Sequence, residues 1–160
     1  MRCDVISREE LPGLIQWIRT GYIEQKVAEG GWNAEDAEKS ADEELAGLFP
    51  DDDLREGHEL YIVREDDAPE GGDPIGHLWI GVLRQMSNTL FIYDIEIRPA
   101  AQGRGLGRAV MAFAEERARA LGCTSVALHV FGGNEAAIGL YRSLGYKVTD
   151  LNLRKDLISS

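Results

Sequence analysis

The segment from Ile95 to Arg108, IEIRPAAQGRGLGR, constrains the fold of this 160-residue chain more than any other. An apolar, strand-like run ends before Pro99, a glycine-rich loop follows, and a helical pattern begins near Leu106. Glycines let the main chain approach an anion closely, and the free N–H groups at a helix N-terminus point towards it. The segment therefore predicts a strand, a phosphate-binding loop and a helix, in that order.

The spacing of the loop excludes two common phosphate-binding motifs. A P-loop needs GxxxxGK followed by Ser or Thr, and the chain contains no such run. A dinucleotide fingerprint needs GxGxxG, but the third glycine position after Gly103 and Gly105 holds Arg108. What remains is Gln102-x-x-Gly105-x-Gly107, which taken alone is also compatible with a glycine-rich turn that binds nothing.

A second motif lies further along the chain. Residues 124–131 (TSVALHVF) read as a strand, and a helical pattern follows that Asn134 is suited to cap. Ala137 and Tyr141 recur at helical spacing, and Gly145 stands where the helix would end. The second motif is therefore again a strand, a turn and a helix.

Together the two motifs resemble the acetyl-CoA signature of the GCN5-related N-acetyltransferases, the GNAT superfamily. In that superfamily Gln/Arg-x-x-Gly-x-Gly/Ala joins a strand to a helix, and a later strand ends before Asn-x-x-Ala-x-x-x-Tyr-x-x-x-Gly-Phe/Tyr. Here the later positions read Asn134, Ala137, Tyr141, Gly145 and Tyr146. The resemblance covers roughly residues 59–155, while residues 1–58 match the family in the order of their elements alone.

The hydrophobic patterns divide the chain into ten elements. The expected strands are 3–7, 59–64, 75–83, 89–97, 124–131 and 147–153, and the expected helices are 8–26, 34–49, 106–121 and 135–144. The expected fold class is α+β, with a mixed central β-sheet flanked by helices in the order β-α-α-β-β-β-α-β-α-β, which is also the order of the GNAT fold. Residues 1–160 are expected to form a single GNAT domain.

Charge and composition limit the partners and the location. The net charge of −11 argues against nucleic acid, and it permits a cationic substrate, although solubility alone also explains it. Apolar runs fall short of the roughly 20 residues of a membrane span, and the N-terminus lacks the apolar stretch of a signal peptide, so we expect a cytoplasmic protein. Cys3 and Cys123 match no metal-ligand spacing, so no metal is expected. A homodimer is left open.

Acetyl transfer to an amine requires that the amine lose a proton, that the thioester carbonyl be polarised and that the leaving thiolate be protonated or stabilised. The resemblance implies direct transfer without an acyl-enzyme, a backbone N–H of residues 95–98 as the polarising group, and Tyr141 near the CoA sulfur. A phenol has a reference pKa of about 10 and stays protonated at neutral pH. Packing within the apolar face of its helix is the alternative role of Tyr141.

Asp94 and Glu96 are the candidates for the catalytic base. The period of two in a strand puts both on one face, and Glu96 lies nearer the glycine-rich loop. Glu96 is therefore the expected base and Asp94 an expected substrate-binding residue, and simple exposure or ion pairing is the alternative for both.

The resemblance also implies the binding residues. Acetyl-CoA, as co-substrate, is expected to contact Ile95, Ile97, Gln102, Gly103, Arg104, Gly105, Leu106, Gly107, Arg108 and Asn134. The acceptor, a small-molecule or peptide amine, is expected beside the first two helices and to contact Tyr22, Trp32 and Asp94, because a tryptophan can hold an amine by a cation–π contact.

The expected function is therefore an acetyl-CoA-dependent N-acetyltransferase that moves an acetyl group directly to a primary amine. One alternative is a GNAT-fold protein that binds CoA or another acyl-CoA without acetylating an amine. Another is a nucleotide-binding protein of a different fold, which would need a ribose or base partner after the loop. The sequence does not name the acceptor.

Overall fold

The computed structural model describes residues 1–85 and 88–158, and in this part of the chain five strands form one sheet. The strands are β1 (Arg2–Val5), β2 (His58–Arg64), β3 (Gly76–Leu83), β4 (Thr89–Ile97) and β5 (Ser125–Leu128), and they lie in that order across the sheet. Neighbours from β1 to β4 are antiparallel, whereas β5 is parallel to β4. The mixed sheet expected from the sequence is confirmed.

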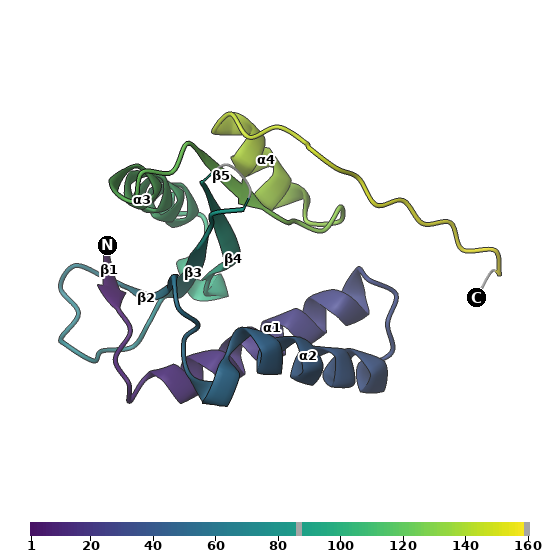
Figure 1. Cartoon of the computed structure of the whole chain (residues 1–160), viewed down its shortest axis with the longest axis horizontal. Coiled ribbons are helices and arrows are strands. Elements are labelled where there is room, and N and C mark those ends of the chain that lie inside the picture. The colour runs from purple at the N-terminus through teal and green to yellow at the C-terminus, as the bar shows by residue number, and fades with distance from the viewer. Residues whose placement is uncertain (86–87, 159–160) are drawn as a thin grey trace.

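Helices cover both faces of the sheet. They are α1 (Leu11–Ala28), α2 (Ala34–Leu48), α3 (Leu106–Ala120) and α4 (Glu135–Ser143), with short 3₁₀ turns at Pro50–Asp52 and Pro99–Ala101. Figure 1 shows α1 and α2 on one side of the strands and α3 and α4 on the other. None of the helices in the described residues is both long and apolar enough to cross a membrane.

Each face of the sheet has its own hydrophobic core. On the α3 side, Leu78, Ile80 and Leu90 of the strands pack with Val110 and Met111 of the helix, and all five are fully buried. On the α1 side, a second cluster is built from Leu11, Leu14, Ile18, Phe49, Leu60, Ile62 and Trp79. The alternation of side chains along the strands explains why one sheet supplies both cores.

Strand β4 carries a bulge at Tyr93. Trp79 pairs with Asp94 while Ile80 pairs with Ile92, so Tyr93 is the extra residue of β4. In a regular strand, Phe91 and Asp94 would point to opposite faces, because they are three positions apart. The extra residue brings both to the face covered by α1 and α2.

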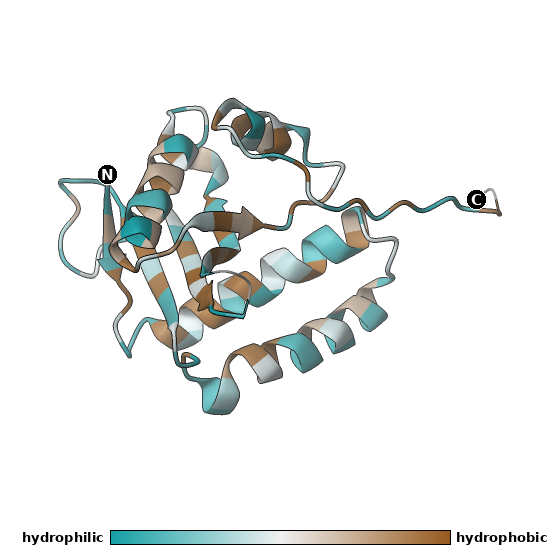
Figure 2. Cartoon of the chain, turned by 45° about the horizontal axis from the view of Figure 1, so that its top comes forward, coloured by the Kyte–Doolittle hydropathy of each residue, from teal (hydrophilic) through white to brown (hydrophobic). Residues whose placement is uncertain are grey.

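The C-terminal segment differs from the sequence-based expectation. Residues 147–153, expected as a last strand, form no helix or strand, and β5 ends at Leu128 rather than Phe131. The segment runs away from the sheet, and Figure 2 shows hydrophobic and hydrophilic residues alternating along it. Its Arg154 donates a hydrogen bond to the carbonyl oxygen of Gly30 at 2.7 Å. The strand pattern was not sufficient because a strand needs a neighbour whose backbone completes its hydrogen bonds, and this segment does not lie beside one.

Candidate active site

A cavity of about 590 Å³ lies where α1, α2, β4 and the residues after β5 meet. Helices α1 and α2 contribute apolar side chains such as Ile18, Leu45 and Leu48, and the opposite wall comes from Val130, Phe131 and α4. Its volume suits a small molecule. Of the residues expected at a substrate or cofactor site, the cavity gathers Tyr22, Asp94, Ile95, Asn134 and Tyr141.

Strands β4 and β5 separate beside this cavity. Their ladder pairs run from Thr89 with Ser125 to Ile92 with Leu128 and end there. Asp94 and Ile95 of β4, and residues 129–131 after β5, line the cavity beyond that point. The two strands therefore diverge here, and backbone groups on the facing edges can bind an extended ligand arm.

Tyr141 and Asn134 reach the cavity from α4. The Oδ1 of Asn134 accepts a hydrogen bond from the backbone N–H of Ala137 at 3.3 Å and caps the helix, so capping and cavity lining coexist at this residue. Burial raises the pKa of the half-buried Tyr141, and the Asp94 carboxylate raises it further. The phenol of Tyr141 is therefore a proton donor at neutral pH.

Asp94 is held by a buried histidine. The Nε2–H of His77 donates to Asp94 Oδ2 at 2.7 Å, which makes the Nε2-protonated form the one that fits this contact. The imidazole is fully buried and makes an edge contact with Trp17 at 4.5 Å between ring centroids. Among the described residues, the His77 Nδ1 has no hydrogen-bond partner. His77 therefore orients a carboxylate that faces the cavity, a role that its strand-like sequence context did not indicate.

Glu96 lies beside Asp94 but outside the set of residues that line the cavity. It stands opposite His77 in the β3–β4 ladder, and side-chain atoms of His77, Asp94 and Glu96 all lie within 4.8 Å of one another. Its Oε2 would be 3.4 Å from a Cβ added at Gly21, so α1 packs against the carboxylate. Of the two candidate bases, Asp94 is the one that the structure brings to the cavity.

The glycine-rich loop joins the end of β4 to α3. Gly103 and Gly105 have left-handed backbones, with φ of 79° and 75°, and an added Cβ would meet nothing within 4 Å at either position. The side-chain amide of Gln102 donates to the carbonyl oxygen of Ile97 at 2.9 Å and ties the loop to β4. The loop therefore leaves open space beside its backbone, as a bound phosphate requires.

The N-terminus of α3 differs from those of α2 and α4. Helix α2 has the Asn33 cap with Glu35 and Asp36 in its first turn, and α4 has an asparagine cap followed by Glu135. Helix α3 begins after Gly105 with no side-chain cap and no acidic residue in its first turn. The first N–H groups of a helix have no acceptor within the helix, and the dipole there favours an anion. The start of α3, from Leu106 to Arg108, therefore fits a pyrophosphate.

Side chains of this region tie α3 to its neighbours. Arg104 forms hydrogen bonds of 2.5 and 3.1 Å with the carboxylate of Glu65, and Arg108 donates to Ser143 Oγ at 2.7 Å. A Cβ added at Gly107 would lie 3.3 Å from Leu140 Cδ2, so this glycine allows close approach of α3 and α4. Helix α4 thus touches the glycine-rich loop region on one side and carries Tyr141 into the cavity on the other.

The residues expected at the acceptor divide into two groups. Tyr22 lines the cavity, and burial together with the nearby Glu44 carboxylate raises its pKa. Trp32 does not line it: the residue is 43% exposed, and the Lys26 ammonium lies 5.4 Å from its ring centroid. Ile97 also lies outside the lining set, one position beyond Glu96 on β4.

Phe91, Tyr93 and Glu44 are among the cavity residues that sequence reasoning missed. The aromatic run FIY could have suggested an aromatic wall, but which of its side chains share a face depends on the bulge at Tyr93. Glu44 belongs to a strongly acidic helix in which nothing local separates it from its neighbours.

A model of the Acetyltransferase (GNAT) family matches residues 15–146, so the chain belongs to this family of N-acetyltransferases. The family membership expected from the two motifs is confirmed. Two relatives from Bacillus subtilis (strain 168) are the uncharacterized N-acetyltransferases YdgE and YycN. YdgE is 29% identical over 137 residues, which cover 85% of each chain. YycN is 29% identical over 153 residues, which cover 95% of this chain and 96% of YycN.

Solved structures agree with this assignment. The crystal structure of YycN superposes with a TM-score of 0.88 over 99% of each chain, at 27% sequence identity. The aminoglycoside N-acetyltransferase AAC(6')-Iy in complex with CoA matches with a TM-score of 0.58 over 99% of this chain and 100% of its own, at 14% identity. The latter likeness concerns the fold alone.

Proposed function

We propose that the protein transfers an acetyl group from acetyl-CoA directly to a primary amine. The observation that carries the proposal is the meeting of Tyr141 and Asp94 at one cavity, in the gap where β4 and β5 separate. A phenol and a carboxylate at one cavity beside such a gap can supply the proton donor and the proton acceptor that acetyl transfer requires.

The open start of α3 supports acetyl-CoA as the acyl donor. Backbone N–H groups from Gln102 to Arg108 would hold the pyrophosphate, and the unpaired edges near Ile95 and Ile97 would hold the pantetheine arm. Asn134 lies at the gap and can donate its side-chain amide to the same arm. The fold relative AAC(6')-Iy binds CoA in its crystal complex, which agrees with this choice of donor. The proposed transfer uses no metal ion.

The amine nitrogen forms a bond to the acetyl carbon while the bond from that carbon to the CoA sulfur breaks. Asp94 accepts the amine proton, directly or through water, and Tyr141 donates its phenolic proton to the leaving thiolate. Glu96 lies within 4.8 Å behind Asp94, so its charge favours a cationic intermediate at the same place. A backbone N–H near Ile95 polarises the carbonyl.

Two measurements test the proposal. Calorimetry with acetyl-CoA, CoA, ATP and NAD should give binding of the first two alone, and release of free CoA thiol should rise when amines are added. Binding of CoA without thiol release over a broad amine panel would favour an acyl-CoA-binding protein that does not acetylate amines. Tight binding of ATP or NAD would favour the nucleotide-binding alternative.

We also propose that the chain forms a homodimer through residues 147–158. Large apolar side chains of this segment are exposed, with Leu153 at 91%, and within the described residues no strand pairs with the outer edge of β5. Light scattering after size exclusion should give twice the chain mass, and a chain ending at Tyr146 should give the monomer mass. A monomeric full-length chain would contradict this. In this proposal, residues 1–160 form one domain, and the protein acts in the cytoplasm.

A further inference from the structure

We propose that the acceptor is an arylalkyl amine, an ammonium carried on a flat apolar ring, and that an amine bearing a carboxylate is rejected. This inference rests on the proposed function and names the substrate class of the same site. It combines the aromatic wall of the cavity with the sign and position of its charges.

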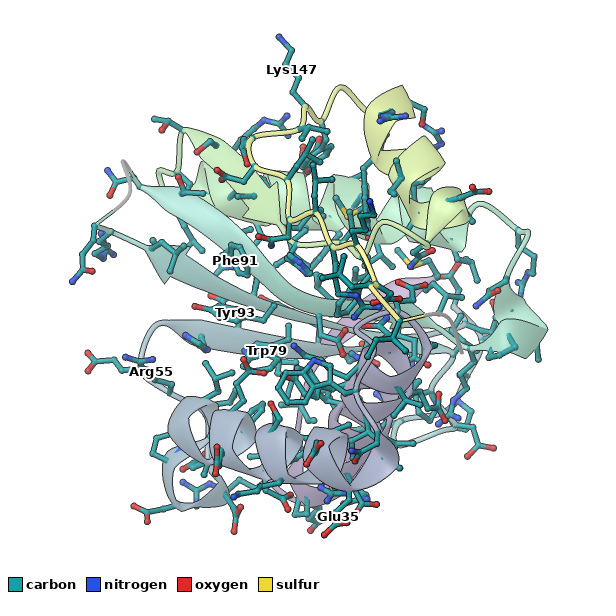
Figure 3. All side chains as sticks on the ribbon, turned by 90° about the vertical axis from the view of Figure 1, so that its right-hand side faces the viewer. Glu35, Arg55, Trp79, Phe91, Tyr93 and Lys147 are labelled. Carbon is teal, nitrogen blue, oxygen red and sulfur yellow. The ribbon has the colours of Figure 1, made fainter. Side chains whose placement is uncertain are left out.

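The acceptor side of the cavity is built from ring faces. Phe91 and Tyr93 of β4 are half-buried and line it together with the buried Trp79 of β3. Tyr93 stacks on Trp79 with centroids 4.9 Å apart and planes at 23°, while Phe91 meets Tyr93 edge-on at 4.9 Å. Figure 3 shows the three side chains following one another from the sheet towards α2. Rings fixed in this way offer a rigid surface on which another ring can pack.

The wall beside these rings is aliphatic. Ile18 of α1 and Leu45 and Leu48 of α2 line the cavity and belong to the cluster in which Tyr93 packs, so a ring on Tyr93 would have further apolar contacts there. A sugar amine would bury several hydroxyl groups against these side chains. Burying hydroxyls without hydrogen-bond partners is unfavourable, so this aliphatic part of the lining disfavours polyhydroxylated acceptors.

The charges in the cavity set the direction of the ligand. Asp94 lies at the Tyr141 end, as the rise in the pKa of the phenol indicates, and Glu44 lies at the Tyr22 end. The one cation among the described lining residues, Lys26, has its ammonium 5.4 Å from the Tyr22 ring centroid, where the ring face already attracts it. The amine therefore points to Asp94 and its ring lies on Tyr93.

Two carboxylates with one such lysine also explain the expected rejection of anionic amines. An α-amino acid carries its carboxylate next to the reacting nitrogen, so binding would bring that carboxylate close to Asp94. Like charges brought together in a partly buried cavity oppose binding. An amine with the same ring but no carboxylate avoids this repulsion.

The test measures binding separately from turnover, with calorimetry on protein saturated with CoA. The probes are 2-phenylethylamine, phenylalanine, which adds one carboxylate to the same skeleton, and glucosamine. We expect 2-phenylethylamine to bind at least about 10-fold more tightly than either of the others. Equal or weaker binding of 2-phenylethylamine would overturn the inference. Binding in this order with no acetylation by acetyl-CoA would leave the inference standing and overturn the proposed function.

Variants of the ring wall provide the matched control. Tyr93→Leu removes the flat face and should weaken the binding of 2-phenylethylamine about 2- to 12-fold, which corresponds to the free energy of one aromatic pair. Tyr93→Phe keeps the face and should bind the probe as the parent protein does. If Tyr93→Leu disturbs the bulge and does not fold, Phe91→Leu makes the same test beside it. Unchanged probe affinity in a folded variant lacking either ring would contradict the inference.

Discussion

The two ends of the molecule differ sharply in how firmly they are packed. Among the described residues, every buried residue lies at or before Ala118, in β2 to β4, in the helices α1 to α3, or at Phe49 and Ala101 beside these elements. Strand β5, helix α4 and residues 147–158 contain none, although they carry Asn134, Tyr141 and one wall of the cavity. The firmly packed region is a scaffold, and the loosely packed region brings functional groups to it.

The difference suggests where ligands act on stability. A region with few buried apolar contacts opens locally at low free-energy cost, and a ligand that binds the closed form stabilises it by mass action. Acetyl-CoA in the gap between β4 and β5 would add contacts to the loosely packed region. The two regions therefore respond differently to mutation.

The largest expected effect comes from the loosely packed region and concerns activity. Tyr141→Phe should lower turnover about 100- to 10,000-fold, or about 3–5 kcal/mol of barrier, while acetyl-CoA affinity changes little. Because burial and Asp94 raise the pKa of Tyr141 above its ordinary value of about 10, an alkaline fall in activity from this group should lie above pH 10. Turnover equal to that of the parent protein in a chemistry-limited assay would return Tyr141 to a packing role.

The next effect concerns stability, and here the larger loss is expected in the firmly packed region. Leu90→Ala removes a fully buried side chain of β4 and should cost about 2–5 kcal/mol of unfolding free energy. Ile138→Ala, on the half-buried face of α4, should cost only about 1 kcal/mol. Urea unfolding measures both. Similar losses for the two variants would mean that α4 is packed as firmly as the scaffold.

Asp94→Asn and Glu96→Gln compare the two carboxylates on β4, at the boundary between the regions. Since Asp94 lines the cavity and Glu96 does not, Asp94→Asn should lower turnover about 100-fold at neutral pH, and Glu96→Gln should lower it less. The loss should shrink at high pH, where more of the amine is already unprotonated. Initial rates across pH measure this. A larger loss for Glu96→Gln would restore Glu96 as the base that the sequence favoured.

Gly105→Val tests the phosphate loop against a matched position. Both Gly105 and Gly122 have φ near 75° with open space beside them, at opposite ends of α3. A branched side chain at either should cost about 1–2 kcal/mol of stability, because it strains the backbone equally. Only Gly105→Val should also weaken the binding of acetyl-CoA, by at least about 10-fold, or about 1.4 kcal/mol. Calorimetry measures the affinity of both variants for acetyl-CoA. Equal affinities would mean that the loop is not part of the binding site.

The smallest effect concerns the Arg104–Glu65 ion pair, which joins the loop to the end of β2. Glu65→Gln should leave the free energy of unfolding almost unchanged, because exposed ion pairs contribute little to stability. It frees the Arg104 guanidinium for the phosphates and should strengthen acetyl-CoA binding slightly, most clearly at low salt. A weaker affinity would mean that the pair positions the loop.

The parts of the site that the sequence predicted are those whose chemistry is local. The loop glycines with left-handed backbones, the asparagine cap of α4 and the tyrosine seven positions after it are each defined by a few neighbouring residues. The same holds for the strand and helix patterns on which the fold class rests. The resemblance to the family predicted that Tyr141 lies near the CoA sulfur, whereas its spacing alone would have indicated a packing role.

What only the tertiary structure decided depends on partners far apart in the chain. The bulge at Tyr93 exists because β3 and β4 pair in two registers, and it alone places Phe91 and Asp94 on one face. The contact of His77 with Asp94, and the position of Glu96 behind it, follow from the same pairing. Trp32 lies outside the cavity, and residues 147–153 form no strand. Local patterns determine which elements a chain can form, whereas register and strand partners are settled by the free energy of packing the whole molecule.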